Sequence, residues 1–138
     1  MEKKFINWKK NFNTNVAEID EQHQRLVALI NELYESYVEK KHKDTVGKVI
    51  KELVDYTVYH FDTEEKYFKQ FNYEHTEEHI NEHKSFIDEV TKFNKNFGKN
   101  EGILTTEVLL FLQKWITSHI LGSDMKYVEC FADNGLVD

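Results

Sequence analysis

Apolar residues recur at alternating steps of three and four residues along four separate stretches of the chain. This spacing keeps one stripe of a helix turned toward neighbouring helices, so each stretch predicts an amphipathic helix. The predicted helices cover about residues 18–41, 44–71, 76–97 and 105–121. The chain also has no proline and only 5 glycines, which favours long helices without interruption.

Residues with capping chemistry mark the breaks between these stretches. Asp44, Thr76 and Thr105 are suited to cap the starts of the second, third and fourth helices. Asn72 and Gly122 are suited to end the second and the fourth helix. The connections between the predicted helices are therefore short.

Short connections between long helices make successive helices antiparallel. We therefore predict an all-α fold, an antiparallel up-down-up-down four-helix bundle that forms one domain over residues 1–138. In this prediction residues 1–17 form an N-terminal arm, and residues 123–138 form a C-terminal segment with a short last helix.

Polar residues occupy six core-facing positions of these helices. They are His23, His60, Glu64, His79, His83 and His119. A single histidine at such a position is ordinarily a hydrogen-bonded core residue. A glutamate, however, is almost never fully buried unless it is paired, and an isolated buried carboxylate is costly. The six residues are therefore expected to satisfy one another or to share a cation.

The rise of an α-helix places these residues at one level of the bundle. At about 1.5 Å per residue, His23 and His60 both lie about 25 Å from the first connection. His83 and His119 both lie about 21 Å from the third connection, while Glu64 and His83 lie about 11 Å from the second. All four helices thus bring polar residues to the same cross-section.

Local spacing also favours one metal site. The pairs His60-x-x-x-Glu64 and His79-x-x-x-His83 each place two donors one turn apart on the same helix face.

Asp124 follows His119 by five residues, a spacing that turns away from the site on a regular helix. A break at Gly122 is expected to let Asp124 fold back toward the site. His42 and His75 leave the helical pattern and are predicted to lie on the surface.

The six core-facing residues together with Asp124 supply five imidazoles and two carboxylates. Seven donors exceed what one octahedral ion takes and far exceed tetrahedral zinc. Carboxylates can bridge two ions, and imidazole-rich sites suit iron, although zinc, copper and nickel also accept imidazole. The absence of thiolate ligands argues against an iron–sulfur cluster. The donor set therefore favours a di-iron centre inside the bundle.

Charge and composition exclude several other classes of function. The net charge of −7 disfavours nonspecific binding to nucleic acid, which requires a basic face. No apolar stretch approaches the roughly 20 residues that a membrane span needs, and no secretory signal is visible. Cys130 is the only cysteine, which excludes an internal disulfide and fits a reducing compartment. We therefore expect a soluble, cytoplasmic protein.

Nearly the whole chain resembles the hemerythrin family, and in particular stand-alone bacteriohemerythrins. The segments that carry this resemblance are Asp20–His23, His60–Glu65, His79–His83 and Trp115–His119 with Asp124. Myohemerythrin is itself a known up-down-up-down four-helix bundle, so the resemblance implies the same architecture as the helical pattern.

The resemblance implies a role for each ligand position. One iron is expected on His79, His83 and His119, the other on His23 and His60, with Glu64 and Asp124 as bridges. In the family an oxo or hydroxo group also bridges the irons, and one coordination position stays open for dioxygen.

The resemblance also implies a dry, apolar pocket beside the open position. Ile116 lies one turn before His119, where the family usually has leucine. Trp115 and Phe61 are expected to help line the pocket. Ordinary core packing is the alternative for all three residues, and it accounts for Phe61 at least as well.

Three functions are compatible with these residues. The leading hypothesis is reversible dioxygen binding for storage, delivery or sensing, without catalytic residues. The expected protein partner is an oxygen-using enzyme or a reductase, which the sequence does not identify. A di-iron oxidase, peroxidase or nitric oxide reductase is the alternative, but no spare buried acid or base is expected near the site. The third hypothesis is a metal store or a structural zinc bundle.

Overall fold

The computed structural model describes residues 5–98 and 106–136. All regular elements within these ranges are helical. Four are long α-helices: α1 (Ala17–Val38), α2 (Lys43–Phe71), α3 (Thr76–Gly98) and α4 (Thr106–Ser118). The short elements are the 3₁₀ helix η1 (Lys10–Phe12), the π-helical turn η2 (His119–Ser123), the 3₁₀ helix η3 (Asp124–Tyr127) and the helix α5 (Val128–Asp133).

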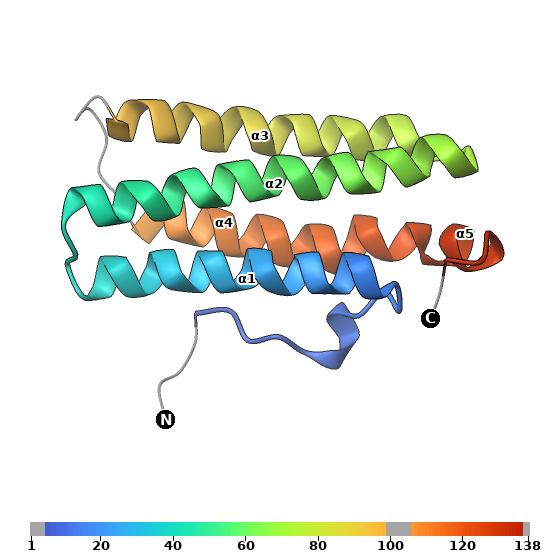
Figure 1. The fold of residues 1–138 in the computed structure, drawn as a ribbon, viewed down its shortest axis with the longest axis horizontal. Coiled ribbons are helices and arrows are strands. Elements are labelled where there is room, and N and C mark those ends of the chain that lie inside the picture. The colour runs from blue at the N-terminus through green and yellow to red at the C-terminus, as the bar shows by residue number, and fades with distance from the viewer. Residues whose placement is uncertain (1–4, 99–105, 137–138) are drawn as a thin grey trace.

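The four long helices lie side by side and alternate in direction (Figure 1). α1 packs against α2 and α4, and α2 packs against α3. The N-terminal segment runs along α1, where the backbone N–H of Ile6 donates to Asn31 Oδ1 at 2.7 Å and the Asn31 amide donates back to the Ile6 carbonyl at 2.9 Å. The predicted up-down-up-down bundle with an N-terminal arm and a short C-terminal helix is confirmed.

The ends of α2 show one wrong and one correct capping prediction. His42, not Asp44, is the N-cap: its ring Nδ1 accepts a hydrogen bond from the Asp44 backbone N–H at 3.1 Å. Asn72 ends the helix in the left-handed region with φ of 52°, a conformation that asparagine tolerates better than most residues. The predicted cap Thr105 lies outside the described residues.

The predicted helix break at Gly122 is wrong. Ser118 and Asp124, at the two ends of η2, both have right-handed helical φ and ψ. The Asp124 N–H donates to the carbonyl of His119, an i→i+5 bond that widens the helix by one residue in this turn. Gly122 has no positive φ, and a Cβ there would meet no atom within 4 Å, so the chain does not require glycine here.

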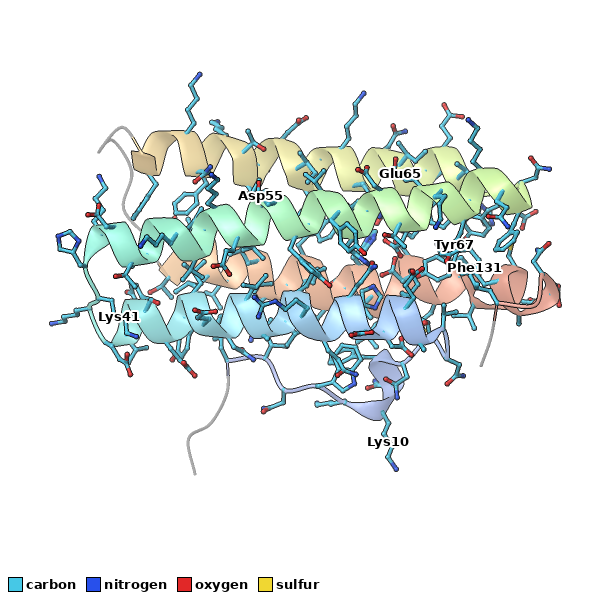
Figure 2. All side chains as sticks on the ribbon, viewed as in Figure 1. Lys10, Lys41, Asp55, Glu65, Tyr67 and Phe131 are labelled. Atoms are coloured by element: carbon cyan, nitrogen blue, oxygen red, sulfur yellow. The ribbon has the colours of Figure 1, made fainter. Side chains whose placement is uncertain are left out.

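Two apolar clusters fill the bundle on either side of the polar level. The larger cluster includes Phe61, Phe86 and Ile116, and the smaller one, at the α5 end, includes Phe68 and Tyr127. Figure 2 shows Tyr67 and Phe131 close together at this end, where their ring centroids are 5.7 Å apart. Within the described residues, no helix has the length and apolar character needed to cross a membrane.

Candidate metal centre

All seven residues that the spacing singles out are buried, none with more than 3% of its surface exposed. They come from α1, α2, α3, the π turn η2 and the start of η3: His23, His60, Glu64, His79, His83, His119 and Asp124. The π turn explains how the last two share one face. Because its hydrogen bonds run from i to i+5, residues five apart lie one turn apart, so His119 and Asp124 both face the core.

The ligand atoms of these residues form two overlapping groups, and within each group they lie within 4.8 Å of one another. The first group, termed the three-histidine end, contains Glu64, His79, His83, His119 and Asp124. The second group, termed the two-histidine end, contains His23, His60, Glu64 and Asp124. The two carboxylates therefore belong to both groups.

Asp124 lies between histidines of three elements. Its Oδ2 is 2.9 Å from Nε2 of His23, and its Oδ1 is 2.9 Å from Nε2 of His79 and 3.1 Å from Nε2 of His119. Burial opposes ionisation of this carboxyl, but His119 and the other histidines outweigh burial and hold its pKa well below the usual range. Burial also opposes the charged form of His119 and so lowers its pKa, but the negative charge of Asp124 outweighs burial and raises the pKa to about 9.

Glu64 likewise lies between histidines of two helices, α2 and α3. Its Oε1 is 3.2 Å from Nε2 of both His60 and His83. Burial and the nearby Asp124 raise the pKa of Glu64, but His60 and His83 lower it by more. The pKa is therefore below its ordinary value and the carboxyl is ionised. Burial lowers the pKa of His60, which keeps this imidazole neutral.

The converging atoms make no hydrogen bonds of acceptable geometry within the described structure. They are Nδ1 and Nε2 of His23, both carboxylate oxygens of Glu64 and Asp124, and Nε2 of His79, His83 and His119. Buried polar atoms are ordinarily hydrogen-bonded, so a group of such atoms around one point needs another partner. Two metal ions fit this donor set, because imidazole nitrogen and carboxylate oxygen are ordinary ligands of iron and other transition metals.

Side-chain acceptors meet the outward-facing Nδ1 atoms of three histidines. The pairs are His60 with Gln22 Oε1 at 2.8 Å, His83 with Glu65 Oε2 at 2.9 Å, and His119 with Glu82 Oε1 at 3.2 Å. An acceptor at Nδ1 fixes the tautomer with the proton on Nδ1 and leaves the Nε2 lone pair directed at the centre.

Two acids that the sequence analysis did not single out lie beside the site, although neither is fully buried. Glu65 and Glu82 are both partly buried and bond directly to site histidines, and Ser123 Oγ donates to both oxygens of Glu82 at 2.6 and 2.8 Å. Burial raises the pKa of Glu82, but the Ser123 hydrogen bond and the nearby His119 lower it below its ordinary value. Each of these acids is adjacent in sequence to a predicted ligand, which was the available signal.

Residues 14–131 match the family described as "Hemerythrin HHE cation binding domain". The chain belongs to the hemerythrin family. It is 34% identical over 122 residues to a bacteriohemerythrin of Pseudomonas aeruginosa, covering 88% of this chain and 78% of the relative. It is 34% identical over 128 residues to a bacteriohemerythrin of Clostridium acetobutylicum, covering 88% of this chain and 98% of the relative.

The fold agrees with solved hemerythrins. The crystal structure of wild-type hemerythrin superposes with a TM-score of 0.88 at 26% sequence identity, covering 93% of this chain and 98% of that chain. A leucine-to-alanine variant of hemerythrin gives the same TM-score and coverage. The resemblance inferred from the sequence motifs is thus confirmed.

Of the three residues predicted to line the pocket, two stack on histidine rings and one lies in the apolar core. Phe61 stacks on the His83 ring with centroids 3.7 Å apart, and Trp115 stacks on His119 at 4.4 Å. Ile116 is 2% exposed and belongs to the larger apolar cluster. All three side chains thus lie near the donor groups, and their role as pocket lining stays a prediction.

Tyr127 is a neighbour of the hemerythrin centre that the sequence reasoning missed. It is fully buried, its hydroxyl has no hydrogen-bond partner within the described structure, and its ring centroid is 5.7 Å from that of His79. Burial, together with the negative charges of Glu64 and Asp124, raises its pKa well above the ordinary value, so the phenol stays neutral. Its position three residues after Asp124, on the same helical face, was the available signal.

The two remaining histidines lie outside both groups of ligand atoms. The side chain of His42 is 77% exposed and caps α2, and that of His75 is 43% exposed beside Glu74 and Glu78. Both are on the surface, as the sequence pattern predicts.

Proposed function

We propose that this chain binds dioxygen reversibly at a non-haem di-iron centre with a bridging oxo or hydroxo group, for oxygen storage, delivery or sensing. The observation that carries the proposal is the pair of overlapping donor groups that share Glu64 and Asp124. Two groups with two common carboxylates suit two ions held side by side, whereas a single zinc needs four donors.

In this proposal His79, His83 and His119 hold one iron, and His23 and His60 hold the other. Glu64 and Asp124 bridge the two ions. When bound, an iron pair would supply two electrons and an open coordination position for reversible dioxygen binding. The two-histidine end offers one histidine fewer, so an ion held there would have room for an exogenous ligand.

The protein's own side chains prepare this centre. Hydrogen bonds from the Nδ1 atoms of His60, His83 and His119 orient the three rings and direct their Nε2 atoms inward. Phe61 is 2% exposed and its ring centroid is 5.8 Å from that of His60, so it gives the space beside the two-histidine end an apolar lining. A dry surrounding favours reversible binding, because water and anions at an open iron promote irreversible oxidation.

Reversible binding is favoured over di-iron enzyme chemistry by the placement of the nearby acids. Glu65 and Glu82 bond to Nδ1 atoms, on the side of each ring that faces away from the shared carboxylates. A general acid or base must reach the reacting atoms, and neither group does. The bacterial relatives of the chain are named bacteriohemerythrin, which also supports a binding function.

Iron quantification and an oxygen-dependent absorption spectrum test the proposal. We expect two irons per chain, and a visible absorption band that appears when the iron(II) protein meets air and disappears under vacuum. The zinc-loaded chain is the control and should show no band. A permanent spectral change, steady-state turnover with a reductant, or one zinc per chain would each contradict the proposal. Location in the cytoplasm and a partner reductase or oxygen-using enzyme stay predictions.

A further inference from the structure

The two ends of the centre differ in the charge that surrounds their histidines. At the three-histidine end, His83 and His119 each have a carboxylate at Nδ1, from Glu65 at 2.9 Å and Glu82 at 3.2 Å. At the two-histidine end, His60 has the neutral amide of Gln22 at 2.8 Å. Nδ1 of His23 has no hydrogen-bond partner within the described structure.

The neutral partner of His60 is held in one orientation. Gln22 is 4% exposed, and its Nε2 donates to Thr63 Oγ1 at 3.3 Å. The Thr63 hydroxyl in turn donates to the carbonyl of Tyr59 at 3.0 Å. Because the amide nitrogen is engaged by Thr63, the amide oxygen faces His60, so this end has a fixed but uncharged acceptor.

The two carboxylates are held beside their histidines by different means. Both oxygens of Glu82 accept hydrogen bonds from Ser123 Oγ, within the π turn that carries His119. Glu65 lies where α2 runs beside α3 (Figure 2), and its side chain is 31% exposed. Both acids thus stay in contact with a ring and partly with solvent.

A carboxylate at Nδ1–H withdraws the proton partly from the ring, so Nε2 becomes a stronger electron donor to a metal than it is beside a neutral amide. We propose that Glu65 and Glu82 are positioning residues that make the three-histidine end hold its metal more tightly, and that the neutral Gln22 leaves the two-histidine end the more labile. This inference rests on the two-metal centre of the proposed function. It adds that residues around the ligands set the order in which the metals leave.

Chelation of the iron(II)-loaded chain under anaerobic conditions tests this inference. An excess of a chromogenic iron(II) chelator should remove one iron in a fast phase, from the two-histidine end, and one in a slow phase. Outer partners of ligating histidines typically contribute about 10- to 100-fold to metal affinity. We therefore expect Glu82→Gln and Glu65→Gln each to accelerate the slow phase about tenfold or more and to leave the fast phase unchanged.

The reverse exchange separates charge from packing. Gln22→Glu has nearly the same shape as the native side chain but adds a carboxylate at His60, so it should slow the fast phase about tenfold. A side chain that serves only to fill space would not produce opposite effects from these two exchanges. Glu78→Gln is the matched control, because that side chain is 74% exposed on α3, one turn before Glu82. Both phases should be unchanged in it.

Release rates that stay within twofold of the native chain in all three variants would overturn the inference. Equal acceleration of both phases by Glu82→Gln would overturn it as well, because that result indicates general loosening. A chain that loads two irons and shows these rate changes without a reversible dioxygen band would support the inference and contradict the proposed function. A chain that takes up one metal would contradict both.

Discussion

The carboxylate oxygens of Asp124 lie 2.9–3.1 Å from Nε2 of three histidines, His23, His79 and His119. Glu64, the other shared carboxylate, lies near two. The three histidines around Asp124 come from α1, α3 and the π turn, so one small side chain joins three elements. Its carboxylate is buried completely, which is tolerable because the imidazoles of three histidines surround it. Neutralising this group should therefore affect metal binding before it affects the fold.

Asp124→Asn is expected to reduce the iron content from two per chain to one or none. Asparagine keeps the volume but removes the negative charge that both groups of ligands share. Asp62→Asn, an exposed acid on α2, is the control and should retain both irons. Elemental analysis after anaerobic loading and desalting gives the stoichiometry. Two irons in the Asp124 variant would contradict a bridging role.

Ile116→Ala tests the dry wall of the centre. Ile116 is 2% exposed, and truncating a buried isoleucine to alanine typically lowers the free energy of unfolding by about 2–5 kcal/mol. The space created three residues before His119 should also admit water and shorten the lifetime of the dioxygen-dependent band. Denaturant unfolding and the decay of the band in air measure the two effects.

Ile116→Leu is the control for that experiment, since it conserves volume and should lower the free energy of unfolding by less than about 1.5 kcal/mol. A band that decays at the native rate in the alanine variant would show that Ile116 is a packing residue and no part of the pocket.

The sequence identifies the ligand positions far better than their partners, and the reason is physical. Burial makes His60 and Glu64 stand out in an apolar stripe, so helical spacing alone brings such residues to one level. Glu82 lies beside His83 in sequence but points partly to solvent, and an exposed glutamate is ordinary on a helix. Only the structure reveals that its carboxylate meets a ring.

At the scale of elements, the π turn reconciles a five-residue spacing with a shared face. α4 ends at Ser118, η2 covers His119–Ser123, and the helical path continues into η3. π-helical turns are rare, occur mostly as single turns inside α-helices, and are frequent at functional sites. The sequence pattern assigns the return of Asp124 to a break at Gly122, because the periodicity of a regular helix gives no sign of a locally wider turn.

Gly122→Ala distinguishes a continuous turn from a break. Alanine is about 1 kcal/mol more favourable than glycine within a helix, and the added Cβ meets no atom within 4 Å. We therefore expect an equal or slightly higher melting temperature and two irons per chain. A clear loss of stability or of one iron would instead favour a break that requires glycine. Circular dichroism during heating, with iron analysis, decides between them.

The helix ends show the limits of capping rules in the same way. Asn72 is predictable as a helix end because asparagine tolerates the left-handed conformation, which it adopts with φ of 52°. Capping preferences favour Asp44 over His42 because aspartate is the commoner cap, yet the ring Nδ1 of His42 accepts the Asp44 N–H. The observed cap lies two residues before the predicted one, and the bundle is unchanged.

At the scale of the whole molecule, a band of polar residues divides the core. The larger apolar cluster reaches the band at Phe61, and the smaller cluster reaches it at Phe68, whose ring centroid is 4.7 Å from that of His79. Neither cluster replaces the partners that the converging nitrogen and oxygen atoms lack. We therefore expect the stability of the bundle to depend on metal bound at the level where its two apolar parts meet.

Removal of the metal is accordingly expected to lower the stability of the entire bundle. A ligand that binds only the folded state stabilises it by about 4 kcal/mol when its concentration is a thousand times the dissociation constant. For a chain of this size, about 1 kcal/mol corresponds to roughly 3–4 °C, so the melting temperature should fall by about 10 °C or more after chelation. Returning iron(II) without air should restore it. The Asp124→Asn chain is the control, because it should gain little stability from added iron. Equal melting temperatures for the loaded and stripped native chain would contradict this dependence.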